Sequence, residues 1–389
     1  MALNSEYIIE RLTRVIFQQP IDRIARIMLG SSTVDCLITA KSSVSIKKYL
    51  KAVSRTNKIN KEFNRGKSQF DDLCQVCLKN FSSVTSPIAL ISQIQRSGGS
   101  LLSQLFDGHE EVHAHPHELM IGYPKKFIWP RIDLRDKPER WFEILFEDIV
   151  IKHFREGYTK GKKHERTFLF IFLPSVQKKI FLRYIDSIDS LALRDVFDGY
   201  MTSYFGAWLN NQNSYGQKRF ITAFTARLAM RKDNMESFFE IYPDGRLISI
   251  MRDPKNWYPS AIRHKPRICR DIEEGIDLWR KSARAMLWNK EKYGDRVCIL
   301  TFEDLITKTK SVMHYLAEFL GVRFDDVLMI PTFNKYPIRA NTSFEAERNG
   351  IIDSTLNRYK TLAQEELEFI ESTTKELYGE VLSLAIRFE

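Results

Sequence analysis

The spacing of hydrophobic residues changes near residue 85. Over residues 7–29 apolar side chains recur every three or four positions, which is typical of amphipathic helices, and Pro20 divides the stretch. Residues 47–69 are basic and polar and fit either an exposed helix or a linker. We therefore predict a helical N-terminal extension over residues 1–80, followed by a second unit over residues 85–389.

From residue 86 onward, short apolar runs alternate with helical patterns. "SPIALISQI" (86–94) is almost continuously apolar, as expected of a strand buried in a parallel sheet. "SLLSQLFDG" (100–108) and "KSVMHYLAEFLG" (310–321) are predicted helices, the second closed by Gly321, and "RLISIM" (246–251) and "RVCILTFEDL" (296–305) are predicted strands. Strands alternating with helices predict an α/β fold with a central parallel sheet covered on both faces.

A glycine-rich turn joins the first predicted strand to its helix, and this order is the context of a phosphate-binding loop. Gly98 and Gly99 let the backbone approach a phosphate closely, and the free N–H groups of a helix start attract anions. Ser97 and Ser100 add hydroxyl groups, and Arg96 adds a positive charge. A tight turn without a ligand is the alternative.

Two nucleotide-binding classes are excluded by their signatures. No lysine follows the glycines, as GxxxxGK[ST] requires, and the GxGxxG dinucleotide pattern is absent.

After the predicted strand 246–251, Asp253 is a predicted helix N-cap and Pro254 the first helical residue.

Composition limits the partners. The net charge of +10 favours an anionic ligand, but lysine and arginine are scattered along the chain, so we expect no nucleic-acid partner. No stretch reaches the ~18 apolar residues of a membrane span, and residues 1–17 lack the apolar core of a secretion signal. We expect a cytoplasmic protein; the sequence indicates no oligomeric state. Cys74 and Cys77 form a lone CxxC pattern, interpreted as buried and structural.

Four segments resemble the PAPS-dependent sulfotransferases (PAPS, 3′-phosphoadenosine 5′-phosphosulfate). Residues 95–112, "QRSGGSLLSQLFDGHEEV", resemble the family's 5′-phosphosulfate loop, [KR]SGTT-L followed by L-D-x-H-P-x-V. "LISIMRDPKNWYPSA" (247–261) is similar to the 3′-phosphate motif, an arginine followed eight residues later by serine, as in Arg252 and Ser260. Residues 293–321 and 339–371 are similar to two later segments, the last from the prokaryotic branch.

The resemblance implies a three-layer, P-loop-like sulfotransferase fold with a central parallel sheet, PAPS as co-substrate and no metal. It also implies a set of donor-binding residues: Arg96, Ser97, Gly98, Gly99, Ser100, Leu101, Arg252 and Ser260. Residues 225–227, Thr-Ala-Arg, fill the place of the family's T-P-[KR] segment. Two departures stand out: Gly99-Ser100 replaces the usual Thr-Thr, and Pro259 should kink the helix that carries Ser260.

Sulfuryl transfer to a hydroxyl needs a proton acceptor. The family places a glutamate about twenty residues after the loop, which makes Glu118 the preferred candidate and His117 the second. Arg96 would stabilise the leaving phosphate. His113, His115 and His117 alternate and would share one face of a strand, an arrangement that zinc could use. We favour instead histidines that line the acceptor pocket or support Glu118.

The implied function is sulfuryl transfer from PAPS to a hydroxyl of a small-molecule, glycan or lipid acceptor. Aromatic residues that could line the acceptor site include Tyr123, Phe127, Trp129, Tyr200, Tyr204, Phe205 and Trp208. The alternatives are another P-loop-like transferase or small-molecule kinase, and a non-catalytic nucleotide-binding protein.

Overall fold

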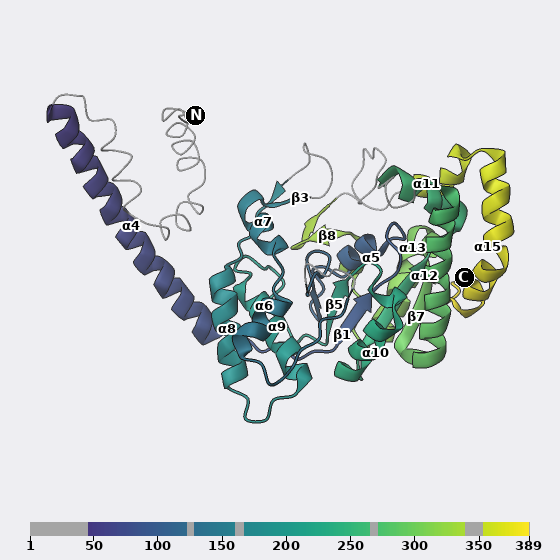
Figure 1. The fold of residues 1–389 in the computed structure, drawn as a ribbon, viewed down its shortest axis with the longest axis horizontal. Helices are drawn as coiled ribbons and strands as arrows, with labels where there is room; N and C mark the ends of the chain where they lie inside the picture. Colours follow the sequence, from purple (N-terminus) through teal and green to yellow (C-terminus); the bar gives the residue numbers. More distant parts are fainter. Residues whose placement is uncertain (1–45, 123–127, 160–166, 265–270, 339–352, 389) are drawn as a thin grey trace. The chain divides into compact units, whose positions relative to one another are not determined.

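The chain divides into two units between Phe81 and Ser82. The computed structural model describes residues 46–122, 128–159, 167–264, 271–338 and 353–388. In the first unit α4 (Ile46–Asn80) is one continuous helix, so the basic stretch 47–69 is helical (Figure 1). The helix predicted over residues 7–29, with Pro20, lies outside the described residues.

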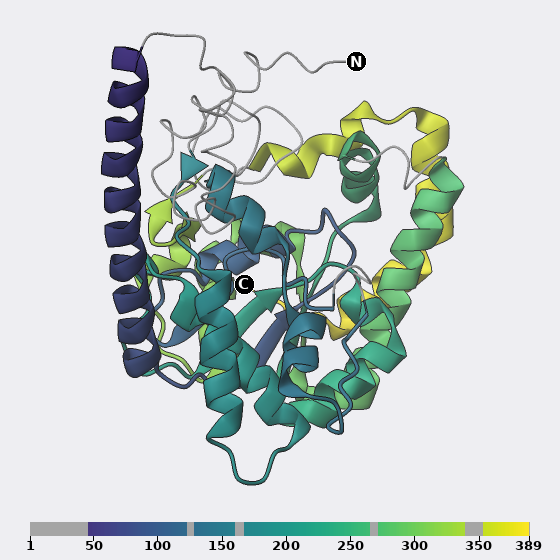
Figure 2. The ribbon, with the colours of Figure 1, turned by 60° about the vertical axis from the view of Figure 1, so that its left-hand side comes forward.

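The second unit is built on a five-stranded parallel sheet with the order β2-β5-β1-β6-β7. Its strands are β1 (Ile88–Ile91), β2 (Val112–Ala114), β5 (Phe220–Phe224), β6 (Arg246–Met251) and β7 (Val297–Thr301). β1 lies at the centre, with Ile88 opposite Ile221 and Ala89 opposite Arg246. The strands run side by side at the centre of the unit, with helices around them (Figures 1 and 2). This confirms the predicted α/β class.

Two of the predicted strands are shorter than their apolar patterns, whereas β6 coincides with its own. β1 covers four residues, although the Ser92 N–H still donates to the Ile248 carbonyl at 3.0 Å. β7 ends at Thr301 because that side chain accepts from the Asp304 N–H and caps α13 (Phe302–Thr307). The prediction of a strand through residue 305 was therefore wrong at its end.

Helices cover both faces of the sheet. One face packs against α5 (Gly99–Leu105) and α14 (Thr309–Leu320), which ends at Gly321 in the left-handed conformation, as predicted. α12 (Ile272–Tyr293) contacts β7 and in turn packs on α15 (Gln364–Leu384) and α11 (Pro254–His264). The remaining helices of the described residues are α6 (Pro138–Leu145), α7 (Ile149–Glu156), α8 (Pro174–Asp186), α9 (Leu193–Ala207) and α10 (Lys232–Ile241), with 3-10 turns at Leu228–Met230, Gly294–Arg296, Asp326–Met329 and Asp353–Thr361. Two short antiparallel strand pairs complete the described fold: β3 (Tyr158–Thr159) with β4 (Thr167–Phe168), and β8 (Thr332–Phe333) with β9 (Tyr336–Pro337).

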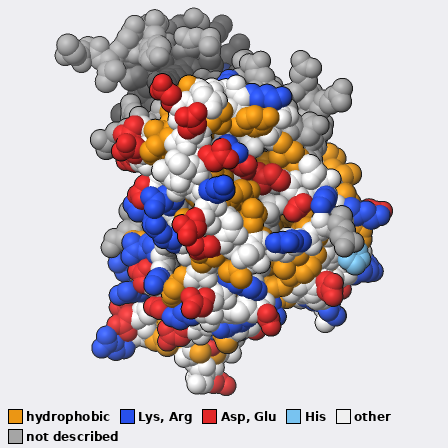
Figure 3. All heavy atoms as spheres, turned by 90° about the vertical axis from the view of Figure 1, so that its right-hand side faces the viewer, with side chains coloured by type: hydrophobic (Ala, Val, Ile, Leu, Met, Phe, Trp, Pro, Cys, Tyr) orange, Lys and Arg blue, Asp and Glu red, His pale blue; other side chains and the backbone are white. Residues whose placement is uncertain are grey.

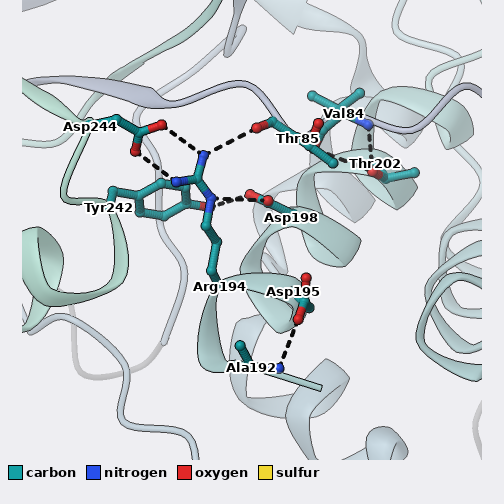
Figure 4. A network of polar contacts seen from close by, with 9 residues as sticks. All are labelled: Val84, Thr85, Ala192, Arg194, Asp195, Asp198, Thr202, Tyr242 and Asp244. Carbon is teal, nitrogen blue, oxygen red and sulfur yellow. Dashed lines mark hydrogen bonds and ion pairs between the residues drawn. The ribbon is translucent and has the colours of Figure 1, made fainter. Parts of the chain in front are cut away.

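A partly buried ionic network fixes the start of α9 (Figure 4). Arg194 donates to both carboxylate oxygens of Asp244, at 2.7 and 3.1 Å, and to the Thr85 carbonyl at 3.2 Å. It also donates to Asp198, which accepts the Tyr242 hydroxyl at 2.8 Å. Three segments distant in sequence are thereby fastened together around one guanidinium.

The surface over α11, α12 and α15 carries acidic and basic side chains interspersed with apolar ones (Figure 3). Among the described helices, none combines the length and apolar character that crossing a bilayer requires.

Candidate active site

The carboxyl ends of the parallel strands meet at one edge of the sheet, where α/β proteins bind their ligands. The segments that follow β1, β5, β6 and β7 therefore lie together there. The Thr225 N–H donates to the Ile91 carbonyl at 3.0 Å, and the Arg227 N–H donates to the Gln93 carbonyl at 2.9 Å. The predicted phosphate loop and the Thr-Ala-Arg segment are thus neighbours.

The loop after β1 makes the turn that its glycines predict. Gly98 has φ of 98°, a conformation that favours glycine, and it stands immediately before α5. A Cβ atom on Gly98 would also lie 2.6 Å from the Phe302 ring. Arg96 adopts a φ of 71°, which is unusual for a residue with a side chain.

Gly99 is fixed by packing. A Cβ atom at this position would lie 2.3 Å from both the Phe224 ring and the Gln93 amide nitrogen. No threonine fits here while Phe224 keeps this position. The departure from the family's Thr-Thr pattern therefore has a steric cause.

Ser97 is buried, and its hydroxyl has no hydrogen-bond partner among the described residues. A buried polar atom of this kind in a glycine turn is typical of a site that takes a ligand. Ser100 is half-buried, whereas Leu101 points into the core on one face of the sheet.

The loop and the segment after β6 form one cationic cluster. The Arg96 Nε donates to the Ser260 hydroxyl at 3.2 Å, and Arg252 donates to the Arg96 carbonyl at 2.8 Å. The Arg252 guanidinium lies over the Phe302 ring, 4.3 Å from its centroid. α11 continues past Pro259, so Ser260 remains on the helix.

The start of α11 is capped as predicted. The Asp253 carboxylate accepts the Lys255 N–H at 2.7 Å, and Pro254 is the first helical residue.

Arg358 also belongs to the cationic cluster, and our sequence analysis missed it. It is 5% exposed and lies in the 3-10 segment Asp353–Thr361, which is joined to α11 by the hydrogen bond from the Tyr359 N–H to Asn256. Burial, together with repulsion from Arg252, Arg96 and Arg263, lowers the pKa of Arg358 to about 9. Burial likewise lowers the pKa of Arg252 to about 10. Mutually repelling, buried guanidinium groups indicate a binding site for an anion.

Arg358 lies in the segment 339–371 that resembles the family, and this position was the only indication of its role in the sequence. Its distance along the chain from the phosphate loop follows no motif, so the sequence could not place it beside the loop. The Asn-Thr-Ser-Phe motif of that segment, residues 341–344, lies outside the described residues.

Glu303 is an acidic group beside this cluster that the sequence analysis did not single out. Its Oε1 accepts the Asp253 N–H at 3.2 Å, and its Oε2 has no partner among the described residues. Burial raises the pKa of Glu303 to about 7, although its hydrogen bonds and the charge of Arg252 oppose the shift.

Glu118 lies at the same edge of the sheet, half-buried. Its Oε1 accepts the Ala226 N–H at 3.2 Å, and the next residue, Leu119, donates its N–H to the Phe224 carbonyl at 2.7 Å. Arg227, the residue after Ala226, donates its N–H to the Gln93 carbonyl in the loop after β1. The Thr-Ala-Arg segment therefore lies between Glu118 and the phosphate loop.

His117 is placed differently from Glu118, because it is buried on the side of α9. One imidazole nitrogen bonds to the Glu118 carbonyl at 2.9 Å and the other to the Tyr204 hydroxyl at 2.8 Å. Burial and the neighbouring His115 lower the pKa of His117 to about 3, so the ring is neutral at neutral pH.

The three alternating histidines all contact aromatic residues of α9, although β2 ends at Ala114. His113 stacks on Phe205, with centroids 4.4 Å apart, while His115 and His117 contact Tyr204. Burial lowers the pKa of His113 to about 3.

Within the described part of the chain, one group has the spacing of metal ligands: His115, His117 and Glu147, with ligand atoms within 4.8 Å of one another. Each of these nitrogen and oxygen atoms already has a hydrogen-bond partner.

A small pocket of about 10 Å³ lies beside Glu118. Its side chains are apolar except for Thr225 and the indole N–H of Trp129, and the lining consists of Leu119, Met120, Ile121, Ile128, Trp129, Pro130, Thr225 and Leu228. Of the aromatic residues proposed for the acceptor site, Trp129 lines this pocket. Tyr200, Tyr204, Phe205 and Trp208 are instead buried in the core, and Tyr123 and Phe127 lie outside the described residues.

Comparison with solved structures returns bacterial sulfotransferases at low identity. The sulfotransferase domain from the curacin biosynthetic pathway is 16% identical, covers 76% of this chain and 99% of its own, and has a TM-score of 0.43. The sulfotransferase from Alicyclobacillus acidocaldarius is 14% identical, covers 78% and 97%, and has a TM-score of 0.41. A structure of retinol dehydratase with retinol and PAP is 10% identical, covers 79% and 84%, and has a TM-score of 0.37. Among curated proteins none matches the sequence.

The sequence profile of one protein family, described as the sulfotransferase family, matches residues 87–326. This range is more than half of the chain and includes the phosphate loop, Glu118 and the Arg252–Ser260 segment. The protein is therefore an enzyme of the sulfotransferase family.

Proposed function

We propose that the protein transfers a sulfuryl group from PAPS to the hydroxyl of an apolar small-molecule or lipid acceptor. The observation that carries the donor assignment is the cluster of the buried Arg252 and Arg358 with the partly buried Arg96, beside a glycine turn with an unpartnered serine hydroxyl. Three guanidinium groups match a donor that carries two separate phosphate groups.

The donor's two ends take different parts of the cluster. The N–H groups of residues 97–101 and the Arg96 side chain bind the 5′-phosphosulfate. Arg252, Ser260 and Arg358 bind the ribose 3′-phosphate. Because Arg96 bonds to Ser260, the two parts are contiguous.

In the reaction the acceptor oxygen forms a bond to sulfur while the bond from sulfur to the bridging phosphate oxygen breaks. The departing 3′-phosphoadenosine 5′-phosphate (PAP) gains negative charge on that oxygen, and Arg96 with the loop N–H groups stabilises it. The acceptor's proton passes to Glu118. His117 is the weaker candidate because both its nitrogens are hydrogen-bonded and a pKa of about 3 makes it a poor proton acceptor.

The pocket beside Glu118 supports the choice among acceptor classes. Leu119, which lines the pocket, follows Glu118 in the chain. Thr225, also in the lining, precedes Ala226, whose N–H donates to the Glu118 carboxylate, so the pocket lies next to Glu118. The side chains of the pocket are mostly apolar, so the part of the acceptor that contacts them should be hydrocarbon.

Calorimetry with two nucleotides tests the donor site. PAP should bind much more tightly than 5′-AMP, and Arg252→Ala should remove most of that preference, about 1.5–3 kcal/mol, with the loss of a charge-assisted contact. Arg231→Ala is the matched control, because Arg231 is an exposed arginine paired with Asp233. Equal affinity of the unaltered protein for both nucleotides would exclude the 3′-phosphate assignment.

A transfer screen with labelled sulfate, run over apolar alcohols, phenols and glycans, tests the acceptor. Transfer should survive EDTA, since arginines supply the charge stabilisation. Magnesium-dependent transfer from ATP instead would identify a kinase.

A further inference from the structure

The backbone that carries Glu118 leaves the sheet and returns to it. The His115 N–H donates to the Thr222 carbonyl at 2.8 Å, and the Leu119 N–H donates to the Phe224 carbonyl at 2.7 Å. The step from 115 to 119 is four residues, whereas the step from 222 to 224 on β5 is two, so two extra residues bulge out. Such a bulge loses the ladder bonds of its own backbone and needs other partners.

Two buried imidazoles supply those partners. The Nδ1 atom of His115 bonds to the His117 carbonyl, and the Nδ1 atom of His117 bonds to the Glu118 carbonyl, both at 2.9 Å. A carbonyl can only accept, so both Nδ1 atoms carry a proton.

Glu147 holds the far side of the bulge. This fully buried carboxylate accepts the Met120 N–H at 2.7 Å, the Tyr200 hydroxyl at 3.1 Å and the Nε2 of His115 at 3.1 Å. Burial alone would raise its pKa, but the interactions with His115 and the Met120 N–H hold the pKa of Glu147 below its ordinary value. Glu147 therefore accepts all three bonds as a carboxylate.

The remaining nitrogen of His117 completes the set. Because Nδ1 carries the proton of the neutral ring, Nε2 must accept, and the buried Tyr204 hydroxyl donates to it at 2.8 Å. Every polar atom of His115, His117 and Glu147 thus has a partner of the complementary kind, which accounts for the group without a metal ion.

We propose that these five side chains, His115, His117, Glu147, Tyr200 and Tyr204, form a clamp that positions Glu118 for proton transfer. The clamp acts through the backbone on both sides of Glu118, so its members are positioning residues. The inference rests on the proposed role of Glu118, whereas the hydrogen-bond pattern can be tested without it.

The first experiment is spectroscopic. Nitrogen-15 NMR of the histidine-labelled protein should show His117 as the neutral Nδ1–H tautomer from pH 5 to 8. The titratable groups that face His117 are His115, Glu147 and His153. Tyr204→Phe should keep that tautomer, because Nδ1 still donates to the Glu118 carbonyl, but should shift the Nε2 resonance because Nε2 loses the hydroxyl that donates to it. Tyr242→Phe is the matched control, because Tyr242 is equally buried but donates to Asp198 outside the clamp. An Nε2–H tautomer or an imidazolium at His117 would overturn the proposal, and so would stoichiometric zinc in the purified protein.

The second experiment compares two substitutions of His117. Asparagine can offer its amide N–H in place of Nδ1–H, whereas leucine cannot. The assay measures PAPS turnover with water as the sulfuryl acceptor. His117→Leu should lower kcat by roughly tenfold or more while the affinity for PAP changes little. His117→Asn should keep kcat within about threefold of the rate of the unaltered protein. The same pair of changes at His109, a buried histidine bonded to the Arg323 carbonyl, should leave kcat per folded molecule unchanged.

Equal losses of about 10³-fold in both His117 variants would make His117 the base and overturn the clamp. Unchanged turnover in both would also overturn it. If the unaltered protein does not turn PAPS over at all, the proposed function fails, while the NMR experiment still decides the hydrogen-bond pattern.

Discussion

At the scale of single residues, Glu118 and His117 are adjacent in sequence but differ in surroundings. Glu118 is half-buried beside a pocket, and His117 is enclosed by Tyr204 and the backbone. A general base must contact the hydroxyl group from which it takes the proton. Glu118 can make that contact with the substrate, whereas an enclosed imidazole cannot.

Glu118→Gln keeps the size of the side chain but removes its ability to accept a proton. We expect kcat to fall about 10²–10⁴-fold while PAP affinity changes little, since general base catalysis contributes in this range. Steady-state kinetics with the acceptor found in the screen, together with calorimetry, measure both quantities. A decrease of only a few fold would place the base elsewhere or indicate an acceptor acidic enough to need none.

Gly99 is a second residue whose surroundings decide its identity. Gly99→Ala should lower the free energy of unfolding by about 1–3 kcal/mol, because the added methyl group overlaps the Phe224 ring and the Gln93 amide. Adding Phe224→Val should offset part of the cost of Gly99→Ala, seen as non-additivity in urea denaturation. Gly379→Ala on α15 is the control, because nothing lies within 4 Å of its added atom. Strict additivity would show that the overlap is relieved in another way.

At the scale of elements, α9 has two roles. It carries Tyr200 and Tyr204, which reach Glu147 and His117, and its first turn is fixed by Arg194 (Figure 4). The orientation of α9 therefore decides where both tyrosine hydroxyls lie.

Arg194→Ala should destabilise the protein by about 1–3 kcal/mol, because Asp198 is 3% exposed and loses its cationic partner. Arg140→Ala, at an exposed arginine paired with Glu143, should stay within about 0.5 kcal/mol. Urea denaturation of both variants makes the comparison, and equal effects would mean that the Arg194 network contributes nothing beyond a surface ion pair.

Local pattern sufficed for three of the five strands of the sheet, but not for β2, β5 or the site. The apolar runs predicted β1, β6 and β7, and the caps at Asp253 and Gly321 followed from residue type and position. Glu147 and Arg358 could not be found in this way, because each acquires its role from groups far away in the chain. The end of β7 was also missed, since Thr301 ends that strand through a bond made only once the helix has formed.

At the scale of the whole molecule, the parallel sheet gathers segments from across the sequence. The turns after β1, β5, β6 and β7 share one edge, and the segment Asp353–Thr361 approaches the same place through its packing on α11. Charges that are separated in the sequence therefore influence one another there, and the stability of the fold becomes dependent on pH.

Glu303 is the clearest source of that dependence. Its folded pKa of about 7 lies above its ordinary value of 4.5, so the unfolded chain releases this proton first. Its contribution to stability should therefore fall as pH rises from about 4.5 to 7 and stay low above that, a change of about 2–3 kcal/mol. Glu303→Gln keeps the carbonyl that accepts the Asp253 N–H and should remove this change. Denaturation of both proteins at pH 5 and pH 8 measures the difference, and parallel pH profiles would contradict the assignment.

The contact between Gly99 and Phe224 also restricts how this sequence can change by single mutations. A threonine at position 99 can be tolerated only after the ring at position 224 has become smaller, so the two replacements have a required order. In any other order, a residue on another strand keeps single mutations of this sequence from reaching the double-threonine loop, whatever a second hydroxyl would contribute to donor binding.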